Sequence, residues 1–372
     1  STTTSRSNDG AVAASGNGIA AVGYLPGSPA GVNRLIYLFR RLLMSIPVVW
    51  LGVTATFLII RVGPLNPAAA IVGPVNSAQA QERLDRIEEQ LGLNDPIHIQ
   101  YGEYLVDLVT FDLGQSWVLY PGQDTVALLA QFGPRTIWLG LWAVLIPIFI
   151  GIPLGIYAGL NVNTNRDYLA SITGIVWRAM PNFWLAVILL ALLSRTDALF
   201  FGSGWESFII KTDLIGAPDL SALGTPEGFI IATKQILPAA FVLGSASMGN
   251  ELRLSRTAVL EIINEDFIDT ARAVGVSRWR LIGKHVLRNA LIPLIPVVTS
   301  EAYLLVGGSV LVEVVFGING IGTLFFDAMT SGDLPLAGSL MFVFILLTVS
   351  INIAQDLLYT LIDPRIGYAE RR

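Results

Sequence analysis

The chain has 372 residues, of which 53% are apolar and 14% charged, and its formal net charge is −5. A composition this apolar is typical of an integral membrane protein, and the acidic net charge argues against a nucleic-acid partner. The absence of cysteine excludes disulfides and thiolate metal sites. The two histidines, His98 and His285, are too far apart in sequence for a convincing metal site or catalytic triad, so we predict neither.

The N-terminal segment, residues 1–32, is rich in Ser, Thr, Gly and Ala and has no periodicity, which predicts a disordered cytoplasmic tail. Arg40 and Arg41 then precede an apolar run. Two readings fit this pattern: a twin-arginine signal with its apolar body at residues 42–60, or a first membrane helix with cytoplasmic charges at its start. Because more apolar segments follow, we favour the membrane helix.

Several apolar segments are long enough to cross a hydrocarbon layer about 30 Å thick, which takes roughly 20 residues of helix. They comprise residues 40–61, 136–160, 168–194, 234–256, 291–315 and 338–361. The expected fold is therefore an all-α polytopic membrane protein with six transmembrane helices. The fourth segment is rich in small residues at positions 244–249, which allow helices to approach closely, so we expect it to face the bundle interior.

Basic residues indicate how the chain is oriented. Arg40, Arg41 and Arg166 fall on one predicted side, together with seven basic residues between positions 253 and 288. By the positive-inside rule, both termini and the loop at residues 257–290 are cytoplasmic. Residues 62–135 then form a long first extracytoplasmic loop, with helical spacing over 79–91 and 97–111. It is either a lid over the outer mouth or a surface that receives a solute-binding protein, and the two readings are compatible.

Ionisable side chains inside membrane spans are unfavourable unless they face water or a partner group. Four residues are of this kind: Arg178, Glu251, Glu301 and Glu313. We expect Glu301 to face a pore or a subunit interface rather than lipid, and Glu313 to be structural. The proline of the segment at residues 181–184 predicts a kink that bends the third span. The pathway candidates are Trp184, Asn250, Glu251 and Glu301.

Nucleotide-binding motifs are not found in the sequence. The glycines at residues 317–322 follow a membrane span and have the wrong order for a dinucleotide fingerprint, so we expect a re-entrant or outer-rim turn there. No GxxxxGK[ST] phosphate loop occurs. We therefore predict that this chain is not an enzyme and that any ATP hydrolysis takes place in a separate subunit.

The loop at residues 257–290 contains a charged stretch with the pattern of a short amphipathic helix. Asn264 is a plausible N-cap, and Gly275 is able to end the helix in a left-handed turn. The apolar face comprises Phe267, Ile268, Ala271 and Val274. Nothing else in the chain is an obvious cover for Phe267 and Ile268, so we expect this helix to dock in another protein's groove.

A second helix follows in the same loop, with Ser277 as its expected cap. Arg280, Lys284 and Arg288 form one i, i+4 row along it. This basic row either faces lipid headgroups or contacts an ATPase subunit, and we favour the headgroups.

The amphipathic stretch resembles the cytoplasmic loop of permease subunits in binding-protein-dependent ABC importers, where Glu-Ala-Ala is followed, after three residues, by Gly. The expected coupling residues are Asp266, Asp269, Thr270, Ala271, Arg272, Ala273, Val274 and Gly275. Asp269 and Thr270 stand where the family has Glu and its first Ala. This departure resembles the dipeptide/oligopeptide branch of the family.

Further motifs in the order typical of that branch extend the resemblance to roughly residues 34–368. They are LGLNDP at residues 91–96, DLGQS at 112–116, PNFW at 181–184, VEVVFG at 312–317 and DPR at 363–365. Each motif is moderately specific, whereas the ordered set is strong. Residues 33–372 are thereby expected to form one permease domain, with residues 257–290 as its cytoplasmic coupling loop.

The resemblance implies a cell-membrane permease subunit that forms half of the translocation pathway for di- or oligopeptides or a similar small solute. It implies a second homologous permease, two cytoplasmic ATPases that use ATP and Mg²⁺, an extracytoplasmic solute-binding protein, and no cofactor bound by this chain. Membrane lipid surrounds the spans. Because the branch also includes importers of glutathione, nickel chelates and oligosaccharides, the substrate stays open.

Two alternatives belong to other functional classes. A motor-independent secondary transporter or channel more often shows paired intramembrane carboxylates or repeated broken spans. An intramembrane enzyme needs a nucleophile and a base, or a metal constellation, inside the bilayer, and the two histidines fall in predicted loops or at a membrane edge.

Overall fold

The computed structural model describes residues 30–63, 67–73, 76–90, 92–194, 205, 215–294, 297, 301 and 310–362. Within these ranges the chain is helical, and its only β-type pairing is an isolated bridge between Gln115 and Asp124. This confirms the all-α fold. The tail predicted at residues 1–32 lies outside the described residues up to position 29, and the first helix begins at Ala30. The DPR motif at 363–365 also lies outside them.

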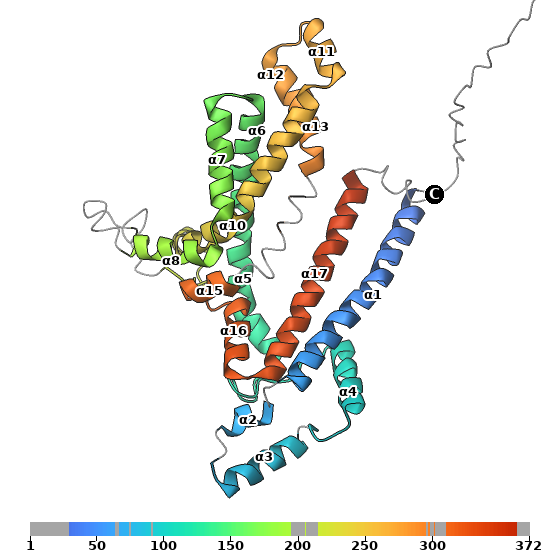
Figure 1. Cartoon of the computed structure of the whole chain (residues 1–372), viewed down its shortest axis with the longest axis vertical. Helices are drawn as coiled ribbons and strands as arrows, with labels where there is room; N and C mark the ends of the chain where they lie inside the picture. Colours follow the sequence, from blue (N-terminus) through green and yellow to red (C-terminus); the bar gives the residue numbers. More distant parts are fainter. Residues whose placement is uncertain are drawn as a thin grey trace, which may run out of the picture.

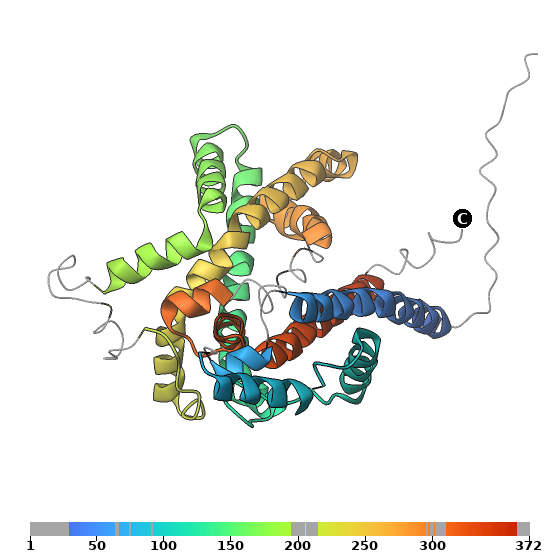
Figure 2. The ribbon, with the colours of Figure 1, turned by 60° about the horizontal axis from the view of Figure 1, so that its bottom comes forward.

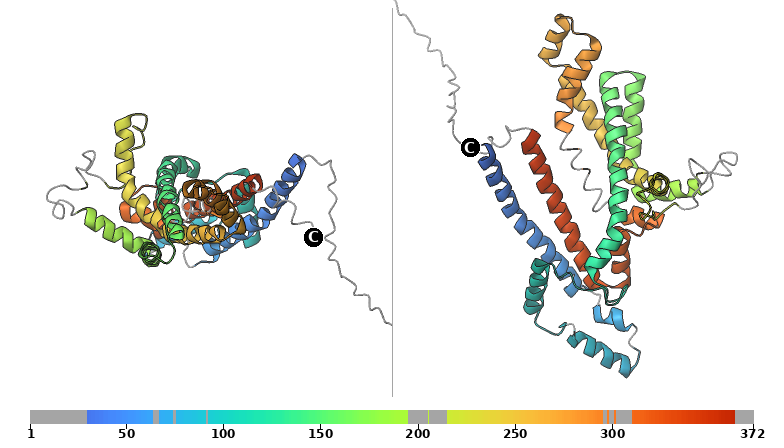
Figure 3. Two further views of the ribbon diagram at one scale, coloured as in Figure 1. Left: turned by 90° about the horizontal axis from the view of Figure 1, so that it is seen from above. Right: turned by 180° about the vertical axis from the view of Figure 1, so that it is seen from behind.

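The first and last helices lie side by side as one arm of the molecule (Figures 1 and 3). They are α1 (Ala30–Val62) and α17 (Leu334–Ile362). Arg41 on α1 pairs with Asp356 on α17 at 2.9 Å, and the backbone at Gly52 lies against the side chain of Ile345. The apolar stretches Phe39–Val62 and Leu334–Leu358 match the predicted first and last spans.

The other arm is built around α10 (Pro226–Ile263), which Thr225 caps by accepting a hydrogen bond from the backbone N–H of Gly228 at 3.1 Å. Its partners are α5 (Thr125–Ile146), a π-helical segment (Pro147–Gly151), α6 (Ile152–Leu160) and α7 (Asn165–Ala179). A Cβ atom at Gly244 would stand 2.1 Å from the carbonyl oxygen of Ala143, so only glycine permits this approach. The small residues of α10 therefore lie in the bundle interior, as predicted.

Two helix pairs in the described part of the chain are sharply bent, and the first is bent more than the sequence indicated. α7 and α8 (Asn182–Leu193) meet at 100° beside Pro181, whose missing N–H prevents a continuous helix. Figure 2 shows the two helices leaving the bend in different directions. The single span expected at residues 168–194 is therefore broken into two helices.

The second bend joins α15 (Val310–Phe316) and α16 (Ile321–Ser331) at 90°. The buried carboxylate of Glu313 fixes it by accepting hydrogen bonds from Thr136 Oγ1 at 2.9 Å and from the backbone N–H of Thr323 at 3.0 Å. A Cβ atom at Gly320 would stand 2.5 Å from the same carboxylate. Glu313 is thus structural and the glycine-rich segment forms a turn, as expected.

Among the described residues, four helical stretches are long and apolar enough to cross a membrane, and there are up to six when each bent pair counts as one span. The predicted fifth span, residues 291–315, is only partly described: α13 (Leu287–Ala290) leads into a 3₁₀ turn (Ile292–Leu294), and α15 follows. Residues 295–296, 298–300 and 302–309 lie outside the described part. The count of six therefore stays a prediction.

The long first loop contains two short helices where helical spacing was predicted, α3 (Ala78–Gln90) and α4 (Ile97–Thr110). A further short helix, α2 (Pro67–Val72), was not predicted. α5 begins at Thr125, well before the predicted residue 136, because Asp124 caps it by accepting from the backbone N–H of Val126 at 2.8 Å. The DLGQS segment is anchored by buried Asp333, which accepts from Ser116 Oγ at 2.5 Å.

The molecule has two opposite ends (Figure 1). The α4 end carries α2, α3 and α4, the turn between α16 and α17, and the last residue of α1. The α11 end carries the turn between α6 and α7 and a projecting hairpin that contains α11 (Asp266–Ala273) and α12 (Arg278–Arg280). Exposed basic side chains gather at this second end: Arg166, Arg253, Arg272, Arg278, Arg280, Lys284 and Arg288.

Candidate functional site: the α11 hairpin

The α11 hairpin follows α10 and returns through α12, a π-helical segment (Leu281–Val286) and α13. Asn264, the predicted N-cap, instead ends α10 and donates from Nδ2 to the carbonyl oxygen of Leu260 at 2.8 Å. Glu265 holds the N-cap position of α11 with its backbone carbonyl accepting from Ile268 at 2.9 Å. Ser277 occupies the N-cap position of α12, but its side chain makes no capping hydrogen bond. The helix predicted after it is interrupted by the π-helical segment.

Gly275 ends the helix region as predicted, in a left-handed conformation with φ of 78°. The backbone N–H of Val276 reaches back to the carbonyl oxygen of Ala271 at 3.1 Å, and that of Gly275 to Arg272 at 3.0 Å. These bonds satisfy carbonyl groups that the end of α11 leaves free. They turn the chain sharply toward α12.

One face of α11 is covered by the chain itself, which corrects the prediction that nothing covers Ile268. Ile268 is fully buried, and Ala271 is 9% exposed. Both belong to an apolar cluster with residues of α10, the π segment and α13, namely Ala258, Val259, Leu281, Val286 and Ala290. Burial of this apolar cluster stabilises the packing of the hairpin against the end of α10.

Other apolar side chains of the hairpin are open to solvent. Phe267 on α11 is 41% exposed, and Val274, which follows α11, is 75% exposed. Trp279 on α12 is 86% exposed. We call these three residues, together with Thr270 between Phe267 and Val274, the docking face. The three side chains lie on the same hairpin, and contiguous exposed apolar surface marks an interaction site.

Polar groups surround the docking face. Asp269 and Arg272 form an exposed ion pair at 3.0 Å, which stabilises the helix by less than about 1 kcal/mol. Thr270 Oγ1 donates to the carbonyl oxygen of Asp266 at 2.9 Å. Arg272 and Arg278 line a hollow of about 480 Å³ beside α11. All the predicted coupling residues are exposed except Ala271, and an apolar centre with a polar rim is the usual composition of a protein interface.

A buried ion pair connects α10 to the neighbouring helix below the hairpin. Arg256 on α10 binds Asp167 on α7 in a bidentate manner, at 2.6 and 2.8 Å. Asp167 is 1% exposed and also accepts from the backbone N–H of Asn163 at 3.1 Å. Sequence reasoning missed this pair and also Trp279, since partners 89 positions apart have no local pattern and Trp279 stood outside the predicted apolar face.

Three of the four pathway candidates lie close together. Glu251 and Glu301 are 2% and 4% exposed, and their side chains lie near each other. Asn250 Nδ2 donates to Glu251 Oε1 at 3.3 Å. Trp184 lies on α8, beyond the bend, and is about half exposed. Arg178, at the end of α7, is exposed.

Comparison with known proteins assigns the family. The family described as "Binding-protein-dependent transport system inner membrane component" matches residues 151–368, and its N-terminal companion matches residues 34–117. The chain belongs to the binding-protein-dependent permease family. Its members are membrane components of transport systems, so the chain is a multi-pass membrane permease.

Similar curated permeases cover nearly the whole chain. The dipeptide transport system permease protein DppB of Alkalihalophilus pseudofirmus is 36% identical over 338 residues, which are 90% of this chain and all of that protein. The oligopeptide permease AppB of Bacillus subtilis is 33% identical, covering 89% of this chain and 99% of AppB. The DppB of Escherichia coli is 30% identical, with 90% and 99% covered. The resemblance drawn from the motifs is thereby confirmed.

The left-handed turn of the permease hairpin permits a direct test. Gly275→Ala places a Cβ atom in a conformation that costs roughly 1 kcal/mol, although nothing lies within 4 Å of it. We expect the backbone amides of α11 to exchange with deuterium about fivefold faster, since the hairpin opens more often. Gly283→Ala is the matched control, because Gly283 has equally open surroundings and no positive φ. Equal exchange rates in the two variants would contradict the role given to Gly275.

Proposed function

We propose that the chain is the permease subunit of an ATP-driven importer, and that a separate cytoplasmic ATPase binds it at the docking face. The observation that supports this most is the division of the hairpin into two faces. Ile268 is buried against the chain's own bundle, whereas Phe267, Val274 and Trp279 project from it. A partner that binds them contacts an element seated on the long α10 helix.

The proposed assembly contains a second homologous permease, two ATPases and an extracytoplasmic solute-binding protein. ATP and Mg²⁺ are used in the ATPases, because this chain has no phosphate-loop motif. The α11 end faces the cytoplasm, in line with the exposed basic residues found there. The α4 end then faces outward and receives the binding protein, with both termini of the chain cytoplasmic and the assembly in the cell membrane.

Short peptides are the proposed cargo. The curated relatives named above are dipeptide and oligopeptide permeases and align along nearly the whole chain. Glu251 and Glu301 are proposed to line the pathway, where two facing carboxylates repel each other unless a proton or a cation lies between them. The amino terminus of a peptide is such a cation.

Transport is proposed to proceed by alternating access. Closure of the ATPase pair on binding ATP displaces the α11 hairpin, and the apolar cluster around Ile268 transmits the displacement to α10. α10 carries Glu251 about 18 Å from its end at Ile263. For this coupling to work, the ATP-bound ATPase has to favour one state of the bundle through differential contacts, which the docking face supplies.

A gradient-driven carrier is the second candidate, because two observations favour it. The carboxyl groups of Glu251 and Glu301 face each other, and two helix pairs are sharply bent. Both features are common in secondary transporters. The family to which the chain belongs weighs against this candidate, since its members work with binding proteins.

Uptake into proteoliposomes separates the two candidates. The chain is reconstituted with its partner permease, ATPases and binding protein, and the uptake of labelled dialanine is followed. We expect uptake to require ATP and to persist when protonophore and ionophore remove all ion gradients. Uptake that follows an imposed gradient and ignores ATP would support the carrier instead.

The orientation is testable because the chain has no native cysteine. Ser277→Cys at the α11 end and Asp112→Cys at the α4 end place single exposed thiols at opposite ends. A membrane-impermeant maleimide added to intact cells is expected to label position 112 and not position 277, with the reverse result in inside-out vesicles. Labelling of both positions from one side would overturn the proposed topology.

A further inference from the structure

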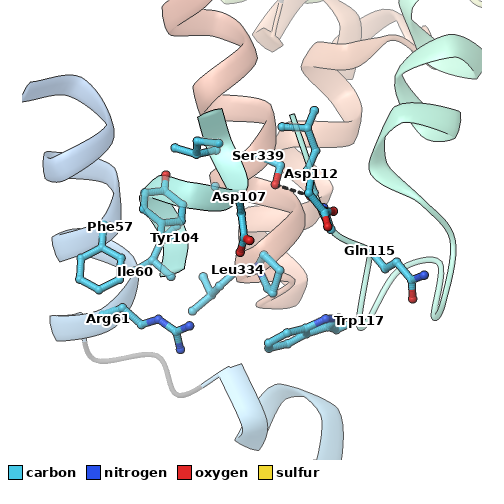
Figure 4. Close-up of a pocket in the computed structure, with 15 residues that line it drawn as sticks. Phe57, Ile60, Arg61, Tyr104, Asp107, Asp112, Gln115, Trp117, Leu334 and Ser339 are labelled. Atoms are coloured by element: carbon cyan, nitrogen blue, oxygen red, sulfur yellow. Dashed lines mark hydrogen bonds between the residues drawn. The ribbon is translucent and has the colours of Figure 1, made fainter. Parts of the chain in front are cut away.

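A pocket of about 260 Å³ lies at the α4 end, far from the α11 hairpin. It is formed where the last turn of α1, the α4 helix, the DLGQS segment and the start of α17 meet. Apolar side chains such as Phe57 and Leu334 provide part of its wall, and Trp117 closes one side (Figure 4). Its volume is just below that of pockets for drug-sized ligands, so it suits a smaller molecule.

The pocket contains two buried polar groups without partners. Arg61 Nη1 and Tyr104 Oη are both shielded from solvent, and neither has a hydrogen-bond partner within the described part of the chain. Figure 4 shows the Arg61 guanidinium directed into the central space. Burial, with a smaller contribution from Tyr101, raises the pKa of Tyr104 to about 12, so its phenol stays protonated and able to donate. A buried donor without a partner is unfavourable, and an anion bound here would relieve this.

Two carboxylates stand on the other side of the same space. Asp107 comes from α4, and Asp112 lies just after that helix; both residues are exposed. Burial, followed by the like charge of Asp112, raises the pKa of Asp107. No ion pair joins Arg61 to either carboxylate among the described residues. Opposite charges thus face one space without neutralising each other.

We propose that this pocket binds a small zwitterion, with its anionic group on Arg61 and Tyr104 and its ammonium group toward Asp107 and Asp112. A carboxylate or phosphate suits the planar donors of a guanidinium, and the carboxylates accept from an ammonium group. Two sources share this chemistry: a free short peptide, and the headgroup of phosphatidylethanolamine. The site extends the proposed function, but it requires neither ATP nor an ATPase.

The test uses the full chain, purified with its partner permease, in nanodiscs of phosphatidylglycerol and without binding protein. Binding of tritiated dialanine is measured by equilibrium dialysis, and retention of added phosphatidylethanolamine by native mass spectrometry. Arg61→Gln is expected to weaken whichever ligand binds by about tenfold or more, because a charged hydrogen bond is lost. The control is Arg83→Gln, which removes an exposed arginine of α3 away from the pocket and is expected to change nothing.

The two charged ends of the ligand are tested separately. Asp107→Asn is expected to weaken dialanine severalfold but not N-acetyl-alanyl-alanine, which lacks the ammonium group. If the wild type retains phosphatidylethanolamine, Arg61→Gln does not, and neither binds dialanine, the lipid headgroup is the ligand. That result still supports the site. Equal binding of both ligands by the wild type and Arg61→Gln, or no binding of either by the wild type, would overturn the proposal, whatever the outcome of the uptake assay.

Discussion

Replacing Phe267 with glutamate is expected to abolish most ATP-driven transport while leaving the chain inserted and folded. Phe267 is a 41% exposed aromatic residue of the docking face, whereas the neighbouring Ile268 makes the contacts within the chain. Loss of a central aromatic contact typically weakens an interface by 2 kcal/mol or more, and a buried unpaired charge adds to that. We therefore expect the ATPase to bind at least about 30-fold more weakly.

The measurement is the affinity of detergent-solubilised permease pairs for the ATPase subunit, with ATP-dependent uptake as the second readout. Asn165→Glu is the matched control, because it adds the same charge at an exposed position of the same end. At the start of α7 this charge is favourable to the helix. Binding and uptake of the Phe267→Glu variant at the level of this control would show that the docking face has no part in assembly.

Replacing Arg256 with glutamine is expected to destabilise the permease, because Arg256 pairs with the buried carboxylate of Asp167. It leaves the carboxylate of Asp167, 1% exposed, without its bidentate partner. Breaking a buried ion pair in this way costs about 3–5 kcal/mol, and the lower figure applies because the Arg256 side chain is 28% exposed. The apparent melting temperature in detergent should then fall by about 5 °C.

Arg253→Gln serves as the control, since Arg253 is an exposed arginine on the same helix. The double variant Asp167→Asn with Arg256→Gln should recover part of the loss, because no unpaired charge is then buried. If the fall in melting temperature of the double variant equals the sum of the falls of the two single variants, Asp167 and Arg256 contribute independently. In that case the pair does not connect α7 with α10.

The helical content, the hairpin and most of the apolar segments were predictable from local patterns in the sequence. The apolar spacing from Phe267 to Val274 and the following Gly275 indicated a short helix with a left-handed end, and the structure has both. Small residues in α10 correctly indicated close helix contacts, because only such residues let the backbones of α5 and α10 touch.

Features that depend on distant parts of the chain were not predictable in this way. The apolar spacing of α11 gave no sign that Ile268 faces inward and Phe267 outward, because the covering residues come from α10, the π segment and α13. The 100° bend at Pro181 exceeds the kink that proline alone suggests. Arg61 and Tyr104 are 43 positions apart and meet only when α1 and α4 pack together.

The central claim is that a separate ATPase contacts this permease at the docking face, and photocrosslinking in the assembled transporter tests it most directly. Benzoylphenylalanine is introduced at Phe267 or, as a control, at Asn165, and the products are identified by mass spectrometry. We predict that position 267 forms a crosslink to the ATPase and that position 165 forms few or none. Crosslinks from position 267 to lipid or to the permease's own chain alone, in an active complex, would contradict the account.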